Sequence, residues 1–193
     1  MQMIDVMSID ILSSAMCSLK ETSKDNHDGT DYYLTDSMIS VINFDKVKNE
    51  YVKALMVSEV PSSNDALYAN GEDLYFIEFK AGVVSRKVYS IKRKIFDSLL
   101  IFTDIVSVGV SYTRANMNYI LVYNEDKNPL SEKEQKEMLD SKSRVDIGTY
   151  FWEGKAKKRF IRFDLERFER LYFKNVYTLT QAQFEKRFVA NWS

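Results

Sequence analysis

An Asn-Gly dipeptide at positions 70 and 71 separates two apolar runs, and it is the feature that most constrains the fold. A two-residue type I′ turn needs positive φ angles at both central positions, which these two residues tolerate. The pattern therefore predicts a β-hairpin with strands at 65–69 and 72–80.

The turn length also determines which side chains share a face of this hairpin. A two-residue turn makes the numbers of paired residues add to an odd number, and a turn shifted by one residue keeps that parity. Asp65 then lies opposite even-numbered residues, among them Glu78 and Lys80. Two carboxylates and one ammonium are thus expected together beside an apolar strand, where ionised groups are costly unless they are paired or functional.

Hydrophobic periodicity and capping residues predict further elements on both sides of the hairpin. Helices are expected at 9–19, 44–55, 89–105, 166–173 and after Thr180, strands at 31–34, 38–42, 117–123 and 159–163, and a loop at 20–31. Asn43 is the expected N-cap of the second helix. Ser131 and Glu134 form a capping-box pattern inside a charged stretch, 124–149, which we expect to be an exposed insertion. The chain is therefore expected to form one α/β (α+β) domain over 1–193, with a central mixed β-sheet flanked by helices.

Composition argues against several classes of protein. The 27 basic and 28 acidic residues nearly cancel, so no global charge favours nucleic acid or a membrane surface. The one cysteine, Cys17, excludes an intramolecular disulfide, and the acidic start of the chain is unlike a signal peptide. The apolar run 99–110 is too short to span a bilayer and contains Asp104. We expect a cytoplasmic protein without a membrane association, and the sequence leaves its oligomeric state open.

The three ionisable residues of the hairpin suit metal-assisted chemistry. Mg²⁺, or Mn²⁺ in its place, prefers one or two carboxylates together with substrate phosphate oxygens and water, so Asp65 and Glu78 are the candidate ligands. Lys80 is placed to orient or deprotonate an attacking water, or to stabilise charge that develops at phosphorus. Such a site would hydrolyse phosphodiester bonds.

These residues resemble the PD-(D/E)XK nuclease superfamily, in which an acidic residue is followed on the next strand by acid-any-lysine. The pattern stands here as Pro61-Ser-Ser-Asn-Asp65 and then Asp73-Leu-Tyr-Phe-Ile-Glu78-Phe-Lys80. The resemblance implies a restriction-endonuclease-like αβββαβ core over roughly 44–123, with helical additions at both ends. It also implies site roles for Glu50 on the preceding helix and for Lys94 on the following one. Pro61 lies four residues before Asp65, and no separate strand is evident between Glu50 and Asp65.

A plain ion pair is the alternative interpretation of the triplet, with Lys80 bridging Glu78 or Asp65 at the end of a strand. Acid-any-lysine also occurs at Glu125-Asp-Lys127, Glu134-Gln-Lys136, Asp140-Ser-Lys142 and Glu153-Gly-Lys155. Those four lie in polar segments, whereas Glu78 and Lys80 interrupt an apolar one. Lys94 shares a helix face with Asp97 and Ser98, and this face either points toward the site or is a solvated polar stripe.

A basic and aromatic segment over 155–174 is the candidate nucleic-acid surface. Bases can stack on its aromatic rings while its cations contact phosphates. The cations assigned to this role are Lys155, Lys157, Lys158, Arg159 and Arg162. The alternative is a helix with an aromatic core face and a solvated basic face.

Two functions therefore remain at this point. The first is a Mg²⁺-dependent nuclease-like domain that acts on nucleic acid. The second is a catalytically inactive nuclease-fold protein that binds another protein, as an immunity protein or inhibitor of a toxin or defence enzyme, because aromatic residues and arginine favour protein interfaces.

Overall fold

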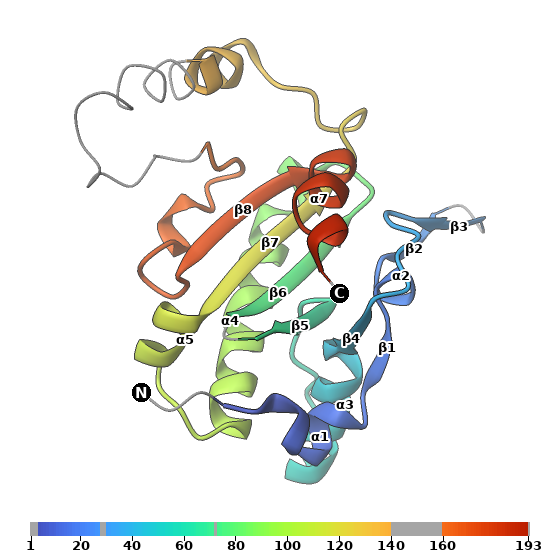
Figure 1. Ribbon diagram of the computed structural model, residues 1–193, viewed down its shortest axis with the longest axis vertical. Helices are drawn as coiled ribbons and strands as arrows, with labels where there is room; N and C mark the ends of the chain where they lie inside the picture. Colours follow the sequence, from blue (N-terminus) through green and yellow to red (C-terminus); the bar gives the residue numbers. More distant parts are fainter. Residues whose placement is uncertain (1–3, 28–29, 72, 140–159, 193) are drawn as a thin grey trace.

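The computed structural model describes residues 4–27, 30–71, 73–139 and 160–192. Within these ranges, a six-stranded mixed sheet in the order β1-β4-β5-β6-β7-β8 is flanked by helices (Figure 1). The predicted α/β class is confirmed. The strands of this sheet are β1 (Met16–Ser18), β4 (Ser40–Asn43), β5 (Ala66–Asn70), β6 (Asp73–Lys80), β7 (Met117–Tyr123) and β8 (Asn175–Thr180).

The pairing of neighbouring strands changes once across the sheet, from antiparallel to parallel. Neighbours from β1 to β6 are antiparallel, and β6, β7 and β8 are parallel. Parallel neighbours need a crossover connection, and α4 (Val88–Ile105) followed by α5 (Val110–Asn116) supplies it between β6 and β7. The carboxyl ends of the three parallel strands therefore meet at one edge, where Lys80, Tyr123 and Thr180 lie side by side.

The predicted hairpin and its parity are confirmed. Ala66 pairs with Ile77 and Asn70 pairs with Asp73, so paired numbers add to an odd number as expected. The turn lies one residue later than predicted, and Gly71 has the positive φ of 57° that it requires. The shift does not change the shared face, so Asp65 and Glu78 still lie opposite each other.

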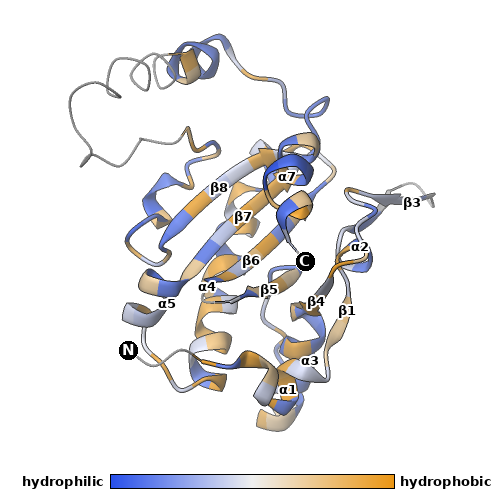
Figure 2. Ribbon diagram, viewed as in Figure 1, coloured by the Kyte–Doolittle hydropathy of each residue, from blue (hydrophilic) through white to orange (hydrophobic). Residues whose placement is uncertain are grey.

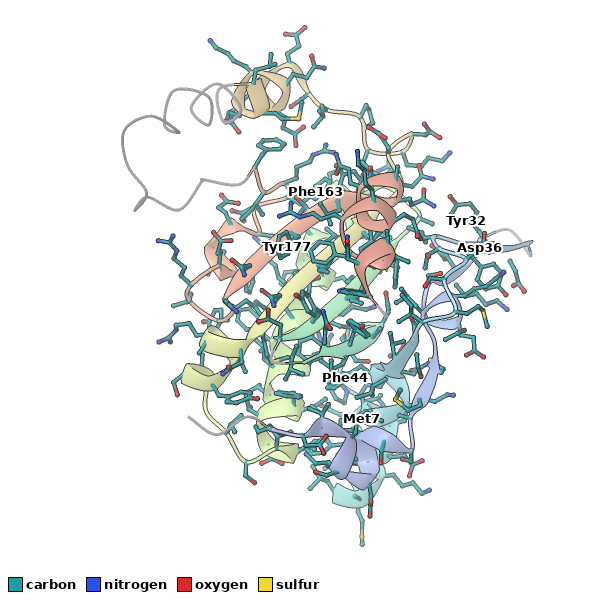
Figure 3. All side chains as sticks on the ribbon, in the orientation of Figure 1. Met7, Tyr32, Asp36, Phe44, Phe163 and Tyr177 are labelled. Atoms are coloured by element: carbon teal, nitrogen blue, oxygen red, sulfur yellow. The ribbon has the colours of Figure 1, made fainter. Side chains whose placement is uncertain are left out.

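The two apolar faces of the sheet are covered by different helices. On one face, α3 (Phe44–Leu55) begins at Asn43, whose side chain accepts from the Lys46 amide, as predicted. Phe44, labelled in Figure 3, meets the ring of Phe76 edge-on at 4.8 Å, and α4 packs beside it. On the other face lies α7 (Gln181–Arg187), which begins with the predicted capping box at Thr180. Figure 2 shows how apolar residues concentrate along the central strands.

The predicted helix at 9–19 is wrong. The segment instead forms α1 (Asp10–Ser13), strand β1 and α2 (Leu19–Thr22). Leu12 and Leu19 are both fully buried, so their helical spacing reflects burial and not a continuous helix. The predicted loop at 20–31 is also wrong in part, because β2 (Lys24–His27) and β3 (Thr30–Tyr33) form a separate two-stranded sheet.

The C-terminal third departs most from the predicted elements. Residues 160–162 have no regular structure, and positive φ angles at Phe163 and Asp164 end any extended segment there. The predicted helix at 166–173 is reduced to the 3-10 turn η3 (Glu166–Phe168), because Arg170 has a φ of 62° that no helix accommodates. Strand β8, which follows, was not predicted.

The element order over 44–123 differs from the αβββαβ pattern in its strands, and a second helix, α5, follows α4. Two strands, β5 and β6, lie between α3 and α4, and the remaining neighbour of β5, strand β4, precedes α3 in the chain. This agrees with the lack of a strand signal between Glu50 and Asp65. Among the described residues, no single helix is long and apolar enough to cross a membrane; α4 and α5 together meet that length and composition but are bent by 105°.

Candidate functional site

The structure brings Asp65, Glu78, Lys80 and Lys94 together on the sheet face that α3 and α4 cover. Asp65 directly precedes β5, and its amide donates to the carbonyl of Ile77, which extends the ladder by one residue. Its carboxylate Oδ2 accepts from the Phe79 amide at 2.6 Å. The backbone of the hairpin thus fixes the carboxylate of Asp65 beside that of Glu78.

Lys94 of α4 joins the two carboxylates. Its Nζ lies 3.0 Å from Asp65 Oδ1 and 2.8 Å from Glu78 Oε1, and it donates to Glu78 Oε2 at 3.0 Å. Lys80 Nζ lies 2.6 Å from Glu78 Oε1. Two negative and two positive charges therefore balance within one cluster, and the ammonium of Lys94 occupies the position that the two carboxylates share.

The cluster is closed on the Glu78 side and open on the lysine side. Glu78 is fully buried, whereas the side chains of Asp65, Lys94 and Lys80 are 16%, 19% and 23% exposed. Solvent or a ligand therefore reaches the carboxylates past the two ammonium groups. We call these four residues the carboxylate–lysine cluster.

Burial and neighbouring charges shift the proton affinities in this cluster. Burial, together with the charge of Glu78, raises the pKa of Asp65 to about 7, although Lys94 and Lys80 act in the opposite direction. Burial alone would lower the pKa of Lys94, but the charges of Glu78 and Asp65 outweigh it and raise that pKa. Lys94 therefore stays protonated at neutral pH. Asp65 is the group in the cluster that gains or loses a proton near neutral pH.

Helix α4 also holds the segment that leads into Asp65. Asp97 Oδ2 accepts from the Ser62 amide and Ser98 Oγ accepts from the Asn64 amide, both at 2.8 Å. With Lys94 these residues form one helix face, so the predicted polar stripe points toward the site. The backbone of Ser62 and Asn64 lies outside the strands, and these side chains of α4 satisfy its amides. The two hydrogen bonds therefore fix the position of Asp65 relative to the helix.

Glu50 is not brought to the cluster. It lies on the outer side of α3, 60% exposed, where it pairs with Lys53. The acidic residue of α3 that contacts the site segment is Asp45, which accepts from the hydroxyl of Ser63. Asp45 lies in the first turn of α3, where acidic residues are common because they interact favourably with the helix dipole. The sequence therefore gives no sign that Asp45 contacts the site segment.

Four buried side-chain atoms in the described part of the chain have no hydrogen-bond partner, and all belong to residues of the cluster or near it. They are Asn64 Nδ2, Asn64 Oδ1, Glu78 Oε1 and the Tyr119 hydroxyl. Glu78 Oε1 lies close to both ammonium groups but at angles unsuited to a hydrogen bond. That oxygen is therefore paired by charge, whereas leaving a buried group such as the Tyr119 hydroxyl without any partner costs about 1–3 kcal/mol. Sequence reasoning missed Asn64 and Tyr119, because each looks ordinary in its loop or apolar strand.

The predicted nucleic-acid surface is not supported at Arg162. Its side chain is 5% exposed and donates four hydrogen bonds, to both carboxylate oxygens of Glu134 and to the carbonyls of Asn128 and Pro129. It also lies over the rings of Tyr123 and Phe163. A buried guanidinium with four of its five N–H donors used in this way is not placed to contact a phosphate. Four further cations assigned to this surface lie outside the described residues: Lys155, Lys157, Lys158 and Arg159.

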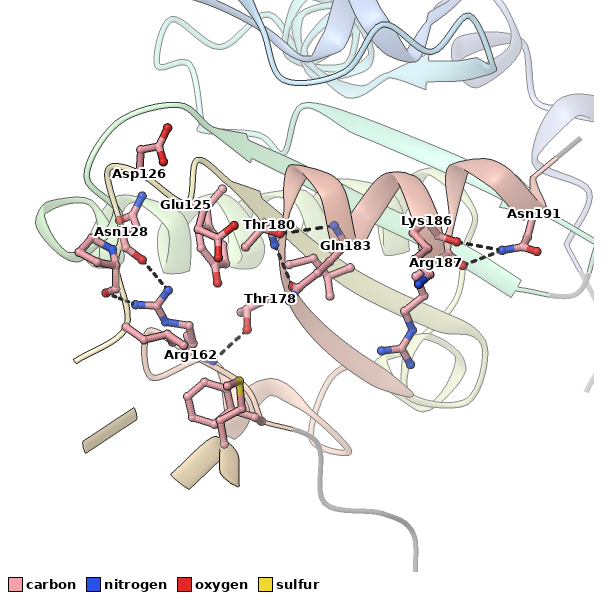
Figure 4. Close-up of a pocket in the computed structure, with 16 residues that line it drawn as sticks. Glu125, Asp126, Asn128, Arg162, Thr178, Thr180, Gln183, Lys186, Arg187 and Asn191 are labelled. Carbon is pink, nitrogen blue, oxygen red and sulfur yellow. Dashed lines mark hydrogen bonds between the residues drawn. The ribbon is translucent and has the colours of Figure 1, made fainter. Parts of the chain in front are cut away.

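Arg162 forms one wall of a pocket at the carboxyl edge of the parallel strands (Figure 4). The pocket has a volume of about 960 Å³, and its other walls come from α7 and the 125–130 loop. Its cations Lys186 and Arg187 are offset by Glu125 and Asp126, so the lining has no dominant charge. The predicted capping box at Ser131 and Glu134 is present here, and Glu134 links it to Arg162.

The residues present fit a small divalent cation with few protein ligands. Two carboxylates already share one cationic group, and Mg²⁺ binds through one or two carboxylates with the remaining ligands from water and phosphate. No group of three or more His, Cys, Asp or Glu side chains that could hold a metal occurs among the described residues. Asp65 and Glu78 are therefore two candidate ligands, and the remaining ligands of an ion bound there would come from water or substrate.

No family model matches this sequence, and no curated protein or solved structure matches it significantly. The cluster's geometry and chemistry are therefore the basis for assigning a function.

Proposed function

We propose that this protein is a Mg²⁺-dependent, PD-(D/E)XK nuclease-like domain that hydrolyses phosphodiester bonds of nucleic acid. One observation carries the proposal: the carboxylates of Asp65 and Glu78 converge on a single cation, the ammonium of Lys94, with Lys80 2.6 Å from Glu78. The same residue types in the same order along the hairpin gave the resemblance to that superfamily.

Lys94 must leave its position for a metal ion to bind. Its Nζ lies 2.8–3.0 Å from the carboxylate oxygens, whereas Mg²⁺ needs oxygens at about 2.0–2.1 Å. The lysine side chain is long and 19% exposed, so it can extend toward solvent without moving α4. Asp65 and Glu78 would hold Mg²⁺, which would supply charge stabilisation at the attacked phosphate.

The two lysines have separate roles in this proposal. Lys80 stays paired with Glu78 and presents its remaining N–H donors to a phosphate oxygen, where negative charge develops. Lys94, once displaced, lies at the open side of the cluster and pairs with an adjacent phosphate. Glu78 is fully buried, so its carboxylate would meet the metal ion on a side of the site that solvent does not reach.

Exposed residues in the connection from β6 to α4 offer a path for the nucleic-acid backbone. Arg86 and Lys87 lie in this connection, between the strand that carries Glu78 and Lys80 and the helix that carries Lys94, and both are exposed. Tyr89, at the start of α4, is 84% exposed. Cations that contact phosphates beside an aromatic ring that stacks bases are typical of single-strand binding surfaces. This surface is separate from the one predicted over 155–174, which stays a prediction at Lys155, Lys157, Lys158 and Arg159.

Calorimetry of Mn²⁺ binding to the wild type and to Glu78→Ala tests the site. We expect Mn²⁺ to bind the wild type and binding to be lost in Glu78→Ala. Single- and double-stranded DNA and RNA are then incubated with Mg²⁺ or Mn²⁺, and Lys80→Ala should abolish cleavage while keeping the metal. Glu50→Ala is the matched control, because Glu50 is exposed and outside the cluster. Cleavage that persists in Lys80→Ala would contradict the assigned chemistry.

A catalytically inactive binding protein, such as an immunity protein or inhibitor, is the second candidate. The observation that favours it is the charge balance of the cluster, since Lys80 and Lys94 already neutralise both carboxylates. The same calorimetry distinguishes the two functions. If Glu78→Ala binds Mn²⁺ as the wild type does and no nucleic acid is cleaved, the cluster is an ion-pair network. Co-purification with the product of a neighbouring gene would then identify the partner.

A further inference from the structure

Unpartnered polar atoms gather around the carboxylate–lysine cluster. In the part of the chain that the structure describes, the buried side-chain atoms without a hydrogen bond belong to Asn64, Glu78 and Tyr119. Asn64 directly precedes Asp65, and Tyr119 lies on the strand next to Glu78. Native proteins pair nearly all buried polar groups, and the exceptions concentrate where a ligand or water completes the pairing. The distribution therefore points to a second state of this site.

The sheet register places Tyr119 diagonally from Glu78. Phe76 pairs with Tyr119 and Glu78 pairs with Leu121, so Tyr119 and Glu78 share a face at neighbouring strands. From strand spacing and rise, their Cα atoms lie roughly 8 Å apart, a distance that an aromatic side chain spans. Tyr119 is fully buried, and its ring packs against that of Phe173 at 5.5 Å. The charges of Glu78 and Asp65 both act on its hydroxyl, which also indicates that the groups are close.

The hydrogen bonding of Glu78 changes when Lys94 leaves. In the present arrangement Lys94 contacts both of its oxygens, and Lys80 contacts Oε1. A cation in place of Lys94 would take one carboxylate oxygen and remove the ammonium donor from the other. A ligating carboxylate is normally held by a further hydrogen bond, whose loss weakens metal binding. Tyr119 is a buried donor on the same face, and its hydroxyl is available.

We propose that Tyr119 is a positioning residue, whose hydroxyl donates a hydrogen bond to Glu78 when a divalent cation displaces Lys94. This inference rests on the proposed function and adds a residue to it. It explains why β7 carries a buried hydroxyl with no hydrogen-bond partner at this point while Lys94 occupies the site. Phenylalanine would fill the same volume without the cost of an unpaired hydroxyl.

Tyr119→Phe tests the proposal, with Tyr68→Phe as its matched control. Tyr68 is a buried tyrosine of β5, two strands away from β7 in the same sheet, and it faces the opposite core. Calorimetry with Mn²⁺ alone, without nucleic acid, measures affinity, and thermal melting measures the metal-free protein. We expect Tyr119→Phe to melt no lower than the wild type and to bind Mn²⁺ about tenfold more weakly. Tyr68→Phe should bind it as the wild type does.

The outcomes separate this inference from the proposed function. Unchanged Mn²⁺ affinity in Tyr119→Phe, together with loss of binding in Glu78→Ala, overturns the role of Tyr119 and leaves the metal site standing. A wild type that shows no Glu78-dependent Mn²⁺ binding overturns both. A large drop in the melting temperature of metal-free Tyr119→Phe also overturns the inference, because the hydroxyl would then already have a partner.

Discussion

Two cations of this protein, the buried Arg162 and the half-buried Lys94, differ in what surrounds them. Arg162 donates four hydrogen bonds, and two of its acceptors are backbone carbonyls that cannot move away. Lys94 contacts only side-chain carboxylates among its described partners, and buried atoms of its neighbours remain unpaired. We interpret the Arg162 network as structural because four of the five N–H donors are already used and the side chain is 5% exposed. The carboxylate–lysine cluster has both a replaceable cation and unused polar atoms, which are properties of a binding site.

The largest expected effect that tests this comparison is at Lys94. Lys94→Met leaves two carboxylates, one of them fully buried, with Lys80 as the remaining cation. Removing one partner of a buried ion pair costs roughly 4 kcal/mol, so urea unfolding of the metal-free variant should show a loss of that order. Millimolar Mn²⁺ should restore much of the stability, because the ion takes the vacated position. A variant that Mn²⁺ does not rescue would argue against a shared cation position.

The pH dependence of stability is the next largest effect. The pKa of Asp65 is about 7 in the folded protein, against an ordinary value of 3.8. The folded protein therefore holds a proton that the unfolded chain has released between these values. The stability that Asp65 contributes is full below about pH 4 and is lost as the pH rises through about 7.

Asp65→Asn isolates this contribution. Relative to the wild type, the variant should gain about 3 kcal/mol of unfolding free energy between pH 4 and pH 8, with allowance for the partial exposure of the carboxyl. Urea unfolding at several pH values measures the difference. A flat difference would mean that Asp65 titrates as an ordinary surface carboxyl.

The sequence predicted these two regions unequally, for physical reasons. The hairpin that carries Asp65 and Glu78 is local, and its parity follows from the turn alone, so the cluster's composition could be predicted before its geometry. The N-cap at Asn43 and strand β7 were predicted for the same reason. The position of Lys94 over both carboxylates depends on how α4 packs, and the sequence left it as one of two alternatives.

The Arg162 network lay beyond sequence reasoning because its partners are distant in the chain. Glu134 and Asn128 are 28 and 34 residues away, and two of the acceptors are backbone carbonyls, which leave no sequence signal. A basic residue beside aromatic ones resembled a nucleic-acid surface, since composition does not distinguish an exposed cation from one whose donors are already hydrogen-bonded within the protein. Glu50 and Tyr119 also depend on packing that the sequence does not specify. The rotation of α3 places Glu50 outside the site. Tyr119 lies in a buried strand, where its hydroxyl gives no sequence signal.

Arg162→Met is the counterpart of the Lys94 experiment. The substitution removes an ion pair and leaves the carbonyls of Asn128 and Pro129 without their donor. We expect a loss of about 2 kcal/mol, since Glu134 is 25% exposed and can turn to water. Mn²⁺ should not restore the stability, and Mn²⁺ affinity should equal that of the wild type. Rescue by the metal would remove the distinction between the two regions.

Glu134→Gln has the smallest expected effect, because it changes only the charge of the side chain. Glutamine also completes a capping box, so the bonds with Ser131 persist while the charge that faces Arg162 is lost. The expected cost is about 1 kcal/mol at neutral pH.

The pH dependence of Glu134 is also opposite to that of Asp65. Burial opposes ionisation of Glu134, but its bonds with Arg162 and Ser131 outweigh burial and lower its pKa. Its contribution is therefore present above the ordinary carboxyl pKa and is lost as the pH falls, opposite in sign to that of Asp65. Urea unfolding of both variants across the same pH series should give difference curves that slope in opposite directions; curves of equal sign would show that the two carboxylates experience similar surroundings.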